Sequence, residues 1–204
     1  YIIMNWDWFK TFSKENPKFW ENYLSSFETP LNDEKYIVFD CETTGLNPET
    51  DRILSIGAVS IKNNQVIVSD FMEIFLQQEV YNSNSVEYHG ILKDGKEEKF
   101  VEAEAVIQFL KFAKNVTLVG HRINFDIEMI NEALSRLSLG TLKNQYMDIG
   151  LMHQKLIDDT SLESISLDEL CKIYKVKKNG RHTASGDAYI TAILFLKLKK
   201  KLSI

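Results

Sequence analysis

The sequence lacks the features of a membrane-spanning or secreted protein. Its 204 residues contain no apolar run that approaches the roughly 18 residues of a membrane span. The first residues, 1–4, lack the basic and apolar regions of a signal peptide. Cysteine is scarce, because Cys41 and Cys171 are the only two, and they form no C-x-x-C pair. We therefore expect no membrane partner and no disulfide framework, and a reducing, cytoplasmic setting.

The sequence also lacks an excess of basic residues. Its 24 basic and 29 acidic residues give a formal charge of −5, which argues against a non-specific nucleic-acid coat. The charge is uneven, because residues 172–204 hold nine basic residues and a single acid, Asp187. A basic loop that runs into His182 could guide a phosphate backbone. The lysines at 199–201 fit a solvated helix end that the helix dipole favours.

The order of short apolar runs and amphipathic stretches predicts an α/β fold. Strands are predicted at 36–41, 52–61, 66–76 and 117–120, and helices at 101–113, 124–137, 166–174 and 184–202, with a short strand and then a helix in 144–157. Asn63-Asn64 is a candidate hairpin turn, Asn124 a candidate N-cap, and Ser166 and Glu169 have capping-box spacing. Strands first, then alternating strands and helices, are typical of a mixed sheet covered by helices.

The first 35 residues differ from the rest. Aromatic and apolar side chains recur at roughly helical spacing over residues 4–27, interrupted at Pro17: Trp6, Trp8, Phe9, Phe12, Phe19, Trp20, Tyr23, Leu24 and Phe27. One or two amphipathic helices are predicted, packed on the domain's own surface or, as the alternative, forming a docking surface for a protein partner or a second copy. Residues 28–35 are polar and favour a linker. We therefore predict an aromatic-rich helical extension with a linker at 1–35 and a main domain at 36–204.

A pair of acids ends the first predicted strand. Because side chains alternate along a strand, Asp40 and Glu42 project to one face and Cys41 to the other. Two carboxylates on one face repel each other unless a cation lies between them, and such hard oxygen ligands suit Mg²⁺ or Mn²⁺. Taken alone, Asp-x-Glu also fits two ordinary solvated acids.

Two further fragments place acids near helix starts. Residues 120–126 (GHRINFD) run from a strand end into a helix and put Asp126 in its first turn, where the helix dipole favours a carboxylate. Residues 181–188 (RHTASGDA) put His182 in a loop and Asp187 early in the last helix. Each fragment alone also fits a helix-start acid or a surface pair.

Together these fragments resemble the three motifs of the DnaQ-like, or DEDDh, 3′→5′ exonucleases of the ribonuclease H-like superfamily, the family of DNA polymerase III epsilon-type subunits. The motif Asp-x-Glu-Thr-Thr-Gly is similar to residues 40–45, and His-x-Ala-x-x-Asp-Ala to residues 182–188. The motif Gly-His-Asn-x-x-Phe-Asp is similar to residues 120–126, with Arg122 where Asn is usual. Ser55 stands where members often carry Glu.

Two shorter segments add to the resemblance. Residues 88–91 (YHGI) resemble the family's His-Gly-Ile segment, and residues 167–171 (LDELC) its Leu-x-x-Leu-Cys helix. The resemblance runs from about Tyr36 to Leu198, so it makes residues 36–204 the exonuclease domain. It implies a ribonuclease H-like three-layer fold with a mixed five-stranded sheet flanked by helices, and an extra N-terminal helical segment.

The resemblance also implies roles for individual residues. Asp40, Glu42, Asp126 and Asp187 would bind two divalent cations, Mg²⁺ or Mn²⁺, with His182 as the general base. The candidate substrate contacts are Thr43, Thr44, Gly45, Leu46, His89, His121 and Phe125. As alternatives, Phe125 belongs to the core and His121 caps the strand–helix turn. The expected reaction is hydrolysis from the 3′ end of nucleic acid, with single-stranded DNA as the expected substrate, releasing nucleoside 5′-monophosphates.

The sequence leaves the substrate and pathway open. A proofreading subunit, a free-standing repair enzyme and an RNA-trimming exoribonuclease all need the same metal site. A small-nucleotide phosphodiesterase needs the same metals in a closed pocket. A binding or scaffolding module that has lost turnover is a further alternative, against which the presence of all four acids and His182 counts.

Overall fold

The computed structural model describes residues 16–30, 35–79, 90–92, 95–159 and 165–204. Its strands are β1 (Lys35–Thr43), β2 (Ile53–Lys62), β3 (Gln65–Leu76), β4 (Lys99–Phe100), β5 (Thr117–Gly120) and β6 (Tyr146–Asp148). Its helices are α1 (Lys18–Ser25), the 3₁₀ turn η2 (Ser26–Glu28), α3 (Glu102–Ala113), α4 (Ile123–Arg136), α5 (Ile149–Ile157), α6 (Leu167–Tyr174) and α7 (Ala184–Leu202). The predicted α/β fold is confirmed.

One mixed sheet has the strand order β4-β3-β2-β1-β5-β6. β1, β2 and β3 form an antiparallel meander, and β5 and β6 run parallel to β1. The turn between β2 and β3 is at Asn63 and Asn64, as predicted, and both residues have a positive φ, 51° and 58°. The sheet has six strands and not the predicted five, because the two-residue β4 pairs in parallel with the end of β3.

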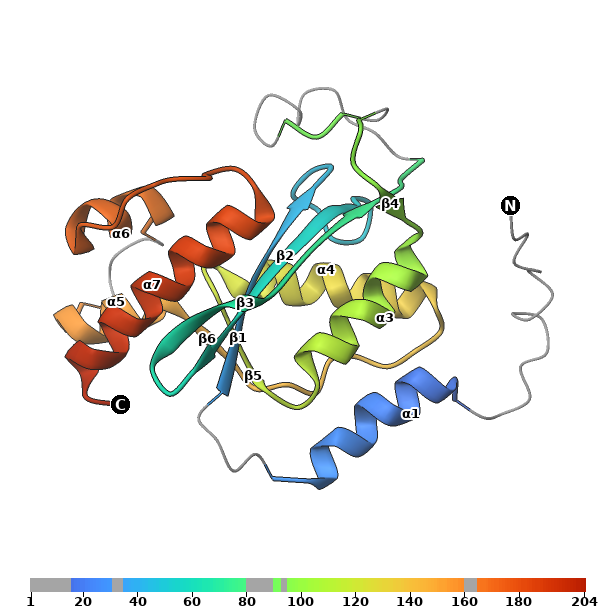
Figure 1. Cartoon of the computed structure of the whole chain (residues 1–204), viewed down its shortest axis with the longest axis horizontal. Helices are drawn as coiled ribbons and strands as arrows, with labels where there is room; N and C mark the ends of the chain where they lie inside the picture. Colours follow the sequence, from blue (N-terminus) through green and yellow to red (C-terminus); the bar gives the residue numbers. More distant parts are fainter. Residues whose placement is uncertain (1–15, 31–34, 80–89, 93–94, 160–164) are drawn as a thin grey trace.

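Helices cover both faces of the sheet (Figure 1). α1, α3 and α4 lie over one face and share its hydrophobic cluster, and α5, α6 and α7 share the cluster of the other. β1 contributes to both clusters in alternation: Phe39 and Cys41 belong to the first and Val38 to the second. Asp40 and Glu42 have the same parity as Val38, so they face the α7 side. The predicted opposite orientation of Cys41 is confirmed.

The aromatic N-terminal segment contributes one helix to the described fold. Trp20 and Tyr23 of α1 are each 3% exposed and pack in the cluster with α3 and α4. The Tyr23 hydroxyl donates to Asn144 Oδ1 at 2.6 Å and accepts from the backbone N–H of Lys143 at 2.8 Å. The other predicted aromatic positions before residue 16, and residues 31–34 of the predicted linker, lie outside the described residues.

The helix starts differ in how they are capped. The Ser166–Glu169 capping box of α6 is confirmed. The predicted N-cap Asn124 is wrong: α4 begins at Ile123, after Arg122 in the left-handed region at a φ of 55°. The Asp148 carboxylate provides the cap instead, because Oδ2 accepts from the backbone N–H of Ile123 at 3.0 Å. Among the described residues, no helix has the length and apolar character that crossing a membrane requires.

Candidate active site

Three carboxylates meet where β1 ends and α7 begins. One oxygen each from Asp40, Glu42 and Asp187 lie within 4.8 Å of one another. Asp40 and Glu42 reach this point from the second half of β1, and Asp187 from the first turn of α7. The Thr183 hydroxyl caps that turn by accepting from the backbone N–H of Gly186 at 3.1 Å. Three of the four predicted ligands therefore form one group.

The approach of α7 depends on Gly57. Gly57 is the β2 partner of Asp40 in the antiparallel register, so the two share a face of the sheet. A Cβ on Gly57 would lie 2.1 Å from the backbone N of Ser185. The Ser185 hydroxyl also donates to Glu73 Oε1 of β3 at 2.5 Å. The missing side chain thus lets the start of α7 lie directly on the sheet and brings Asp187 to Asp40.

The fourth predicted ligand, Asp126, lies beside this group. It is in the first turn of α4 and is 4% exposed. Its Oδ1 accepts from the backbone N–H of Cys41 at 2.9 Å, so β1 holds one of its oxygens. Its charge contributes to raising the pKa of Asp40, which shows that the two acids are electrostatic neighbours.

Burial disfavours the ionised form of the acids, and their mutual repulsion adds to this effect. Burial is the main cause that raises the pKa of Asp40 well above its usual range, and the charges of Asp126, Asp187 and Glu42 add to it. Burial, with the charge of Asp187, raises the pKa of Glu42 to about 7. Burial raises the pKa of Asp126 to about 8. A compensating cation would relieve this cost.

The donor set fits a hard divalent cation. All of its atoms are carboxylate oxygens, which suit Mg²⁺ and Mn²⁺. Asp187 Oδ1 is buried and has no hydrogen-bond partner among the described residues. An unsatisfied buried carboxylate oxygen within a group of acids is the kind of atom that a cation would satisfy.

Arg181 enters the site from the loop before α7. Its guanidinium donates through Nη1 to Asp187 Oδ2 and through Nε to Asp168 Oδ1, the latter at 2.8 Å. Its positive charge partly offsets the rise in the pKa of Asp40 and Glu42. The sequence predicted Arg181 only as part of a basic loop. The one signal for its contact with Asp187 was that it directly precedes His182, the first residue of the third motif.

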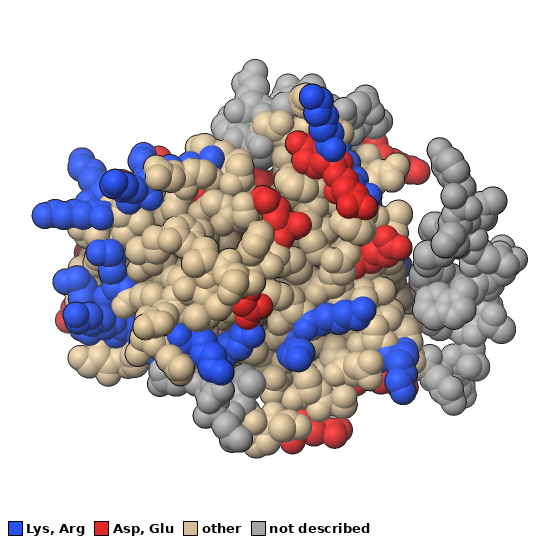
Figure 2. All heavy atoms as spheres, viewed as in Figure 1, with Lys and Arg blue, Asp and Glu red and all other residues tan. Residues whose placement is uncertain are grey.

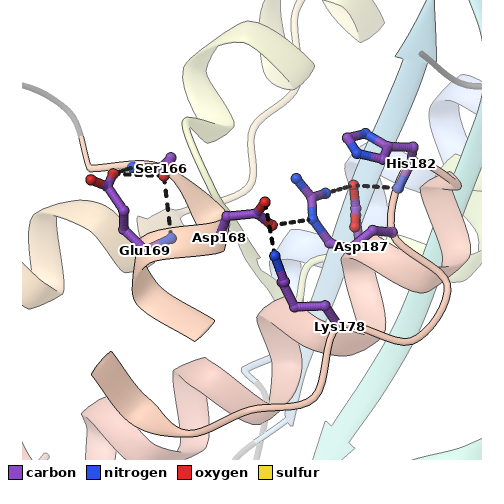
Figure 3. Close-up of polar contacts among 7 residues, drawn as sticks. Ser166, Asp168, Glu169, Lys178, His182 and Asp187 are labelled. Atoms are coloured by element: carbon purple, nitrogen blue, oxygen red, sulfur yellow. Dashed lines mark hydrogen bonds and ion pairs between the residues drawn. The ribbon is translucent and has the colours of Figure 1, made fainter. Parts of the chain in front are cut away.

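His182 lies on the same loop. It is exposed and has a φ of 64°, in the left-handed region. Its backbone N–H donates to Asp187 Oδ2 at 3.3 Å, and Figure 3 shows its imidazole beside this carboxylate. The predicted general base therefore lies next to the acids, with its ring accessible to a substrate.

The loop after β1 forms a tight turn that displays Leu46. The Thr44 hydroxyl donates to Asp51 Oδ1 at 2.8 Å, and the Thr43 hydroxyl donates to the carbonyl oxygen of Gly45 at 2.7 Å. A Cβ on Gly45 would lie 2.5 Å from Asp51 Oδ2, so a larger residue there would displace the carboxylate that holds the turn. Leu46 is 87% exposed at the tip. An apolar side chain is thus held in solvent three residues after Thr43.

The remaining predicted substrate contacts are distributed differently. His121 Nε2 lies 2.8 Å from the carbonyl oxygen of Ile165, and burial lowers the pKa of the ring. Phe125 is half-buried against the hydrophobic cluster of α3 and α4. His89 lies outside the described residues. The structure therefore gives His121 and Phe125 partners within the fold.

The chain matches a known family along most of its length. A family model described as Exonuclease (RNase_T) matches residues 37–195, a stretch that contains the four acids and His182. The chain belongs to this exonuclease family. It is 35% identical over 169 residues to DNA polymerase III PolC-type of Caldanaerobacter subterraneus, and 31% identical over 186 residues to that of Thermotoga petrophila. These matches cover 82% and 90% of this chain but only 12% and 13% of the relatives.

Solved structures show the same fold. Exonuclease I of E. coli in a complex with single-stranded DNA matches with a TM-score of 0.72 at 16% identity, over 84% of this chain and 42% of that chain. Cell-death related nuclease 4 matches with a TM-score of 0.66 at 14% identity, over 82% of this chain and 64% of that one. The mixed sheet with helices on both faces is therefore the exonuclease fold.

Proposed function

We propose that this chain is a divalent-metal-dependent 3′→5′ exonuclease domain. It removes nucleotides from the 3′ end of single-stranded DNA and releases nucleoside 5′-monophosphates. The observation that supports this most directly is the group formed by Asp40, Glu42 and Asp187, with a buried, unpartnered oxygen on Asp187. We propose DNA and not RNA as the substrate because the relatives named above are DNA polymerases.

The proposed chemistry assigns the acids to cation binding. Asp40, Glu42 and Asp187, with Asp126 beside them, would hold two cations, Mg²⁺ or Mn²⁺. When bound, such cations supply stabilisation for the negative charge that develops on the phosphate and on the leaving oxygen. The burial of the acids suits this task, because charge interactions are stronger away from bulk water.

His182 is the proposed general base. Its imidazole accepts a proton from the attacking water as the water oxygen bonds to phosphorus. The bond between phosphorus and the 3′ oxygen of the preceding nucleotide breaks, and that oxygen takes a proton from solvent. The products are a nucleoside 5′-monophosphate and a strand with a new 3′ hydroxyl.

The strand itself would be held by the surfaces around the acids. Leu46 is placed to press against the terminal base, and the Thr43–Gly45 backbone to contact the terminal 3′ hydroxyl. Lys175 and Lys177 are exposed on the loop that leads to His182 and would attract the phosphate backbone. Figure 2 shows basic side chains gathered at the end of the molecule where Figure 1 draws α6. The lysines in the last turn of α7 gather at this end too, but they lie a whole helix away from Asp187 in its first turn.

The proposed catalytic unit, residues 36–204, shares its core with α1. Trp20 and Tyr23 face inward, so these two aromatic residues serve the fold. A docking role for the aromatic segment, as an interface with a protein partner or a second copy, would therefore fall to residues 4–15, which lie outside the described residues.

The test is a strand-shortening assay. A 5′-labelled single-stranded DNA and an RNA of the same sequence are each incubated with the protein and Mg²⁺ or Mn²⁺, and then with EDTA. We expect a ladder of 3′-shortened DNA that requires metal and is lost in Asp187→Ala and His182→Ala. Lys201→Ala, an exposed change at the far end of α7, is the control and retains the ladder.

Each other outcome changes the assignment. A ladder with RNA alone would make the protein an exoribonuclease. Hydrolysis of dinucleotides but not of longer strands would indicate a small-nucleotide phosphodiesterase. Retention of strands without shortening, by folded protein under either metal, would refute the exonuclease proposal in favour of a binding module.

A further inference from the structure

The two oxygens of the Asp187 carboxylate have different surroundings. Oδ2 accepts from the Arg181 guanidinium and from the backbone N–H of His182. Oδ1 is buried and has no hydrogen-bond partner among the described residues. Among the residues that the structure describes, donors therefore occupy one oxygen and leave the other open to a ligand.

Asp168 holds Arg181 from the opposite side. Arg181 Nε donates to Asp168 Oδ1 at 2.8 Å, while Asp168 Oδ2 accepts from Lys178 Nζ at 3.1 Å. Figure 3 shows Asp168 and Lys178 on one side of this arrangement and Asp187 on the other. A guanidinium binds two carboxylates with separate nitrogens in a fixed planar geometry, which the single ammonium of lysine does not reproduce.

Helix α6 provides a rigid base for Asp168. The Ser166–Glu169 capping box fixes its first turn, directly around Asp168. Leu170 is fully buried in the cluster that α6 shares with α7. The orientation of the Asp187 carboxylate is thus tied, through Arg181, to a second helix and not only to its own backbone.

We propose that Asp168 and Arg181 are positioning residues that hold Asp187 Oδ2 and so present Oδ1 to a divalent cation. The inference rests on the proposed function, because it takes Asp187 as a cation ligand. Contacts that orient a metal ligand from outside commonly change metal affinity about 10–100-fold when removed. An arginine that only stood in the place of the cation would act in the opposite sense, because its removal would strengthen cation binding.

The test measures Mn²⁺ binding to the full chain by titration calorimetry after removal of metal with EDTA. We expect the Kd for Mn²⁺ to rise about tenfold or more in Asp168→Asn and in Arg181→Ala. Arg181→Lys keeps the positive charge but lacks the planar guanidinium with its separate nitrogens. We therefore expect its affinity for Mn²⁺ to be little better than that of Arg181→Ala. Because both residues act through one chain of contacts, the double variant binds no more weakly than Arg181→Ala.

The control is Asp70→Asn. Asp70 forms an ion pair of the same kind with Lys35 at 3.0 Å, at the opposite end of β1 from Asp40, so its removal leaves the Kd for Mn²⁺ unchanged.

The kinetic readout separates positioning from strand binding. At saturating Mn²⁺, Asp168→Asn recovers the wild-type kcat, and the KM for the oligonucleotide does not change.

Three results would overturn the positioning role. These are tighter Mn²⁺ binding by Arg181→Ala, an unchanged Kd in Asp168→Asn, and a raised oligonucleotide KM with an unchanged Kd for Mn²⁺. The failure of the proposed function has a different signature: the wild-type chain binds no Mn²⁺, or Asp187→Ala binds it as well as the wild type.

Discussion

The backbone of Ala184 lies directly over Gly57. A Cβ on Gly57 would be 2.2 Å from the carbonyl carbon of Ala184, which is closer than any real Cβ contact. Because Gly57 pairs with Asp40 in the sheet, this contact fixes how near α7 comes to the end of β1. The three-carboxylate group depends on it.

Gly57→Ala should therefore damage both the fold and the site. We expect the free energy of unfolding to fall by about 1–3 kcal/mol, since backbone atoms must move to admit the methyl group. We expect nuclease activity to fall on the order of 100-fold at a temperature where the variant is folded, because Asp187 is displaced. Urea denaturation and the strand-shortening assay measure the two effects.

Gly140→Ala is the matched control. A Cβ there would lie 3.4 Å from an atom of the Trp20 ring, a contact at the edge of ordinary packing, and Gly140 is exposed in the connection between α4 and β6. Equal losses in the two variants would show that the approach of α7 to Gly57 has no special importance.

The stability of the metal-free protein should depend on pH in a defined direction. The pKa of Glu42 is raised from 4.5 to about 7 and that of Asp126 from 3.8 to about 8. Over these intervals the folded protein binds more protons than the unfolded chain, so its stability falls as pH rises. In EDTA, we expect the melting temperature to decrease between about pH 5 and pH 8.

Two comparisons isolate the acids. Asp126→Asn keeps an acceptor for the Cys41 N–H but removes the charge, and we expect a smaller decrease with pH in this variant. Added Mg²⁺ or Mn²⁺ should stabilise the wild type more at pH 8 than at pH 5, because a larger fraction of the acids is ionised at pH 8. A wild-type melting temperature that rises between about pH 5 and pH 8 would contradict the direction of these pKa shifts. An equal slope in the wild type and in Asp126→Asn would contradict the raised pKa of Asp126.

The hydroxyl of Tyr23 should matter for stability but not for chemistry. It connects α1 to Lys143 and Asn144, and Asn144 Nδ2 in turn donates to the carbonyl oxygens of Lys114 and Val116 at 2.8 and 2.7 Å. Tyr23→Phe leaves buried polar groups unpaired, so we expect a loss of about 1–3 kcal/mol in the free energy of unfolding.

A surface hydroxyl on the same helix provides the control for Tyr23→Phe. The Ser25 hydroxyl donates to the carbonyl oxygen of Asn22 in an exposed position, and we expect Ser25→Ala to change stability by less than about 0.5 kcal/mol. Both variants should retain wild-type activity well below their melting temperatures. Loss of activity in folded Tyr23→Phe would instead link α1 to the site.

The basic loop before His182 should act on strand binding alone. Reversing the charges of Lys175 and Lys177 to glutamate should raise the KM for an oligonucleotide and reduce the slope of log KM against log salt by about one for each phosphate that the loop no longer neutralises. The Kd for Mn²⁺ should not change. Reversing Lys200 and Lys201, which are exposed at the end of α7, is the matched control. An equal effect of both pairs would indicate general charge attraction without a path along the loop.

The sequence by itself determined the elements and the face on which the acids lie. Alternation along β1 placed Asp40 and Glu42 together, and local backbone chemistry placed the turn at Asn63-Asn64 and the capping box at Ser166. Such features depend on neighbours within a few residues, which sequence periodicity records. The short β4 gave no such signal, because two residues are too few for a period to appear.

Only the tertiary structure decided how distant segments meet. The cap of α4 comes from Asp148 at the end of strand β6, and His121 contacts the carbonyl oxygen of Ile165. Arg181 connects Asp168 of α6 to Asp187 of α7. In the same way, Gly57 is one glycine among nine until α7 is placed on it. These contacts depend on how far apart whole elements pack, and that separation is set by side-chain volumes across the interface, which no local pattern in the sequence encodes.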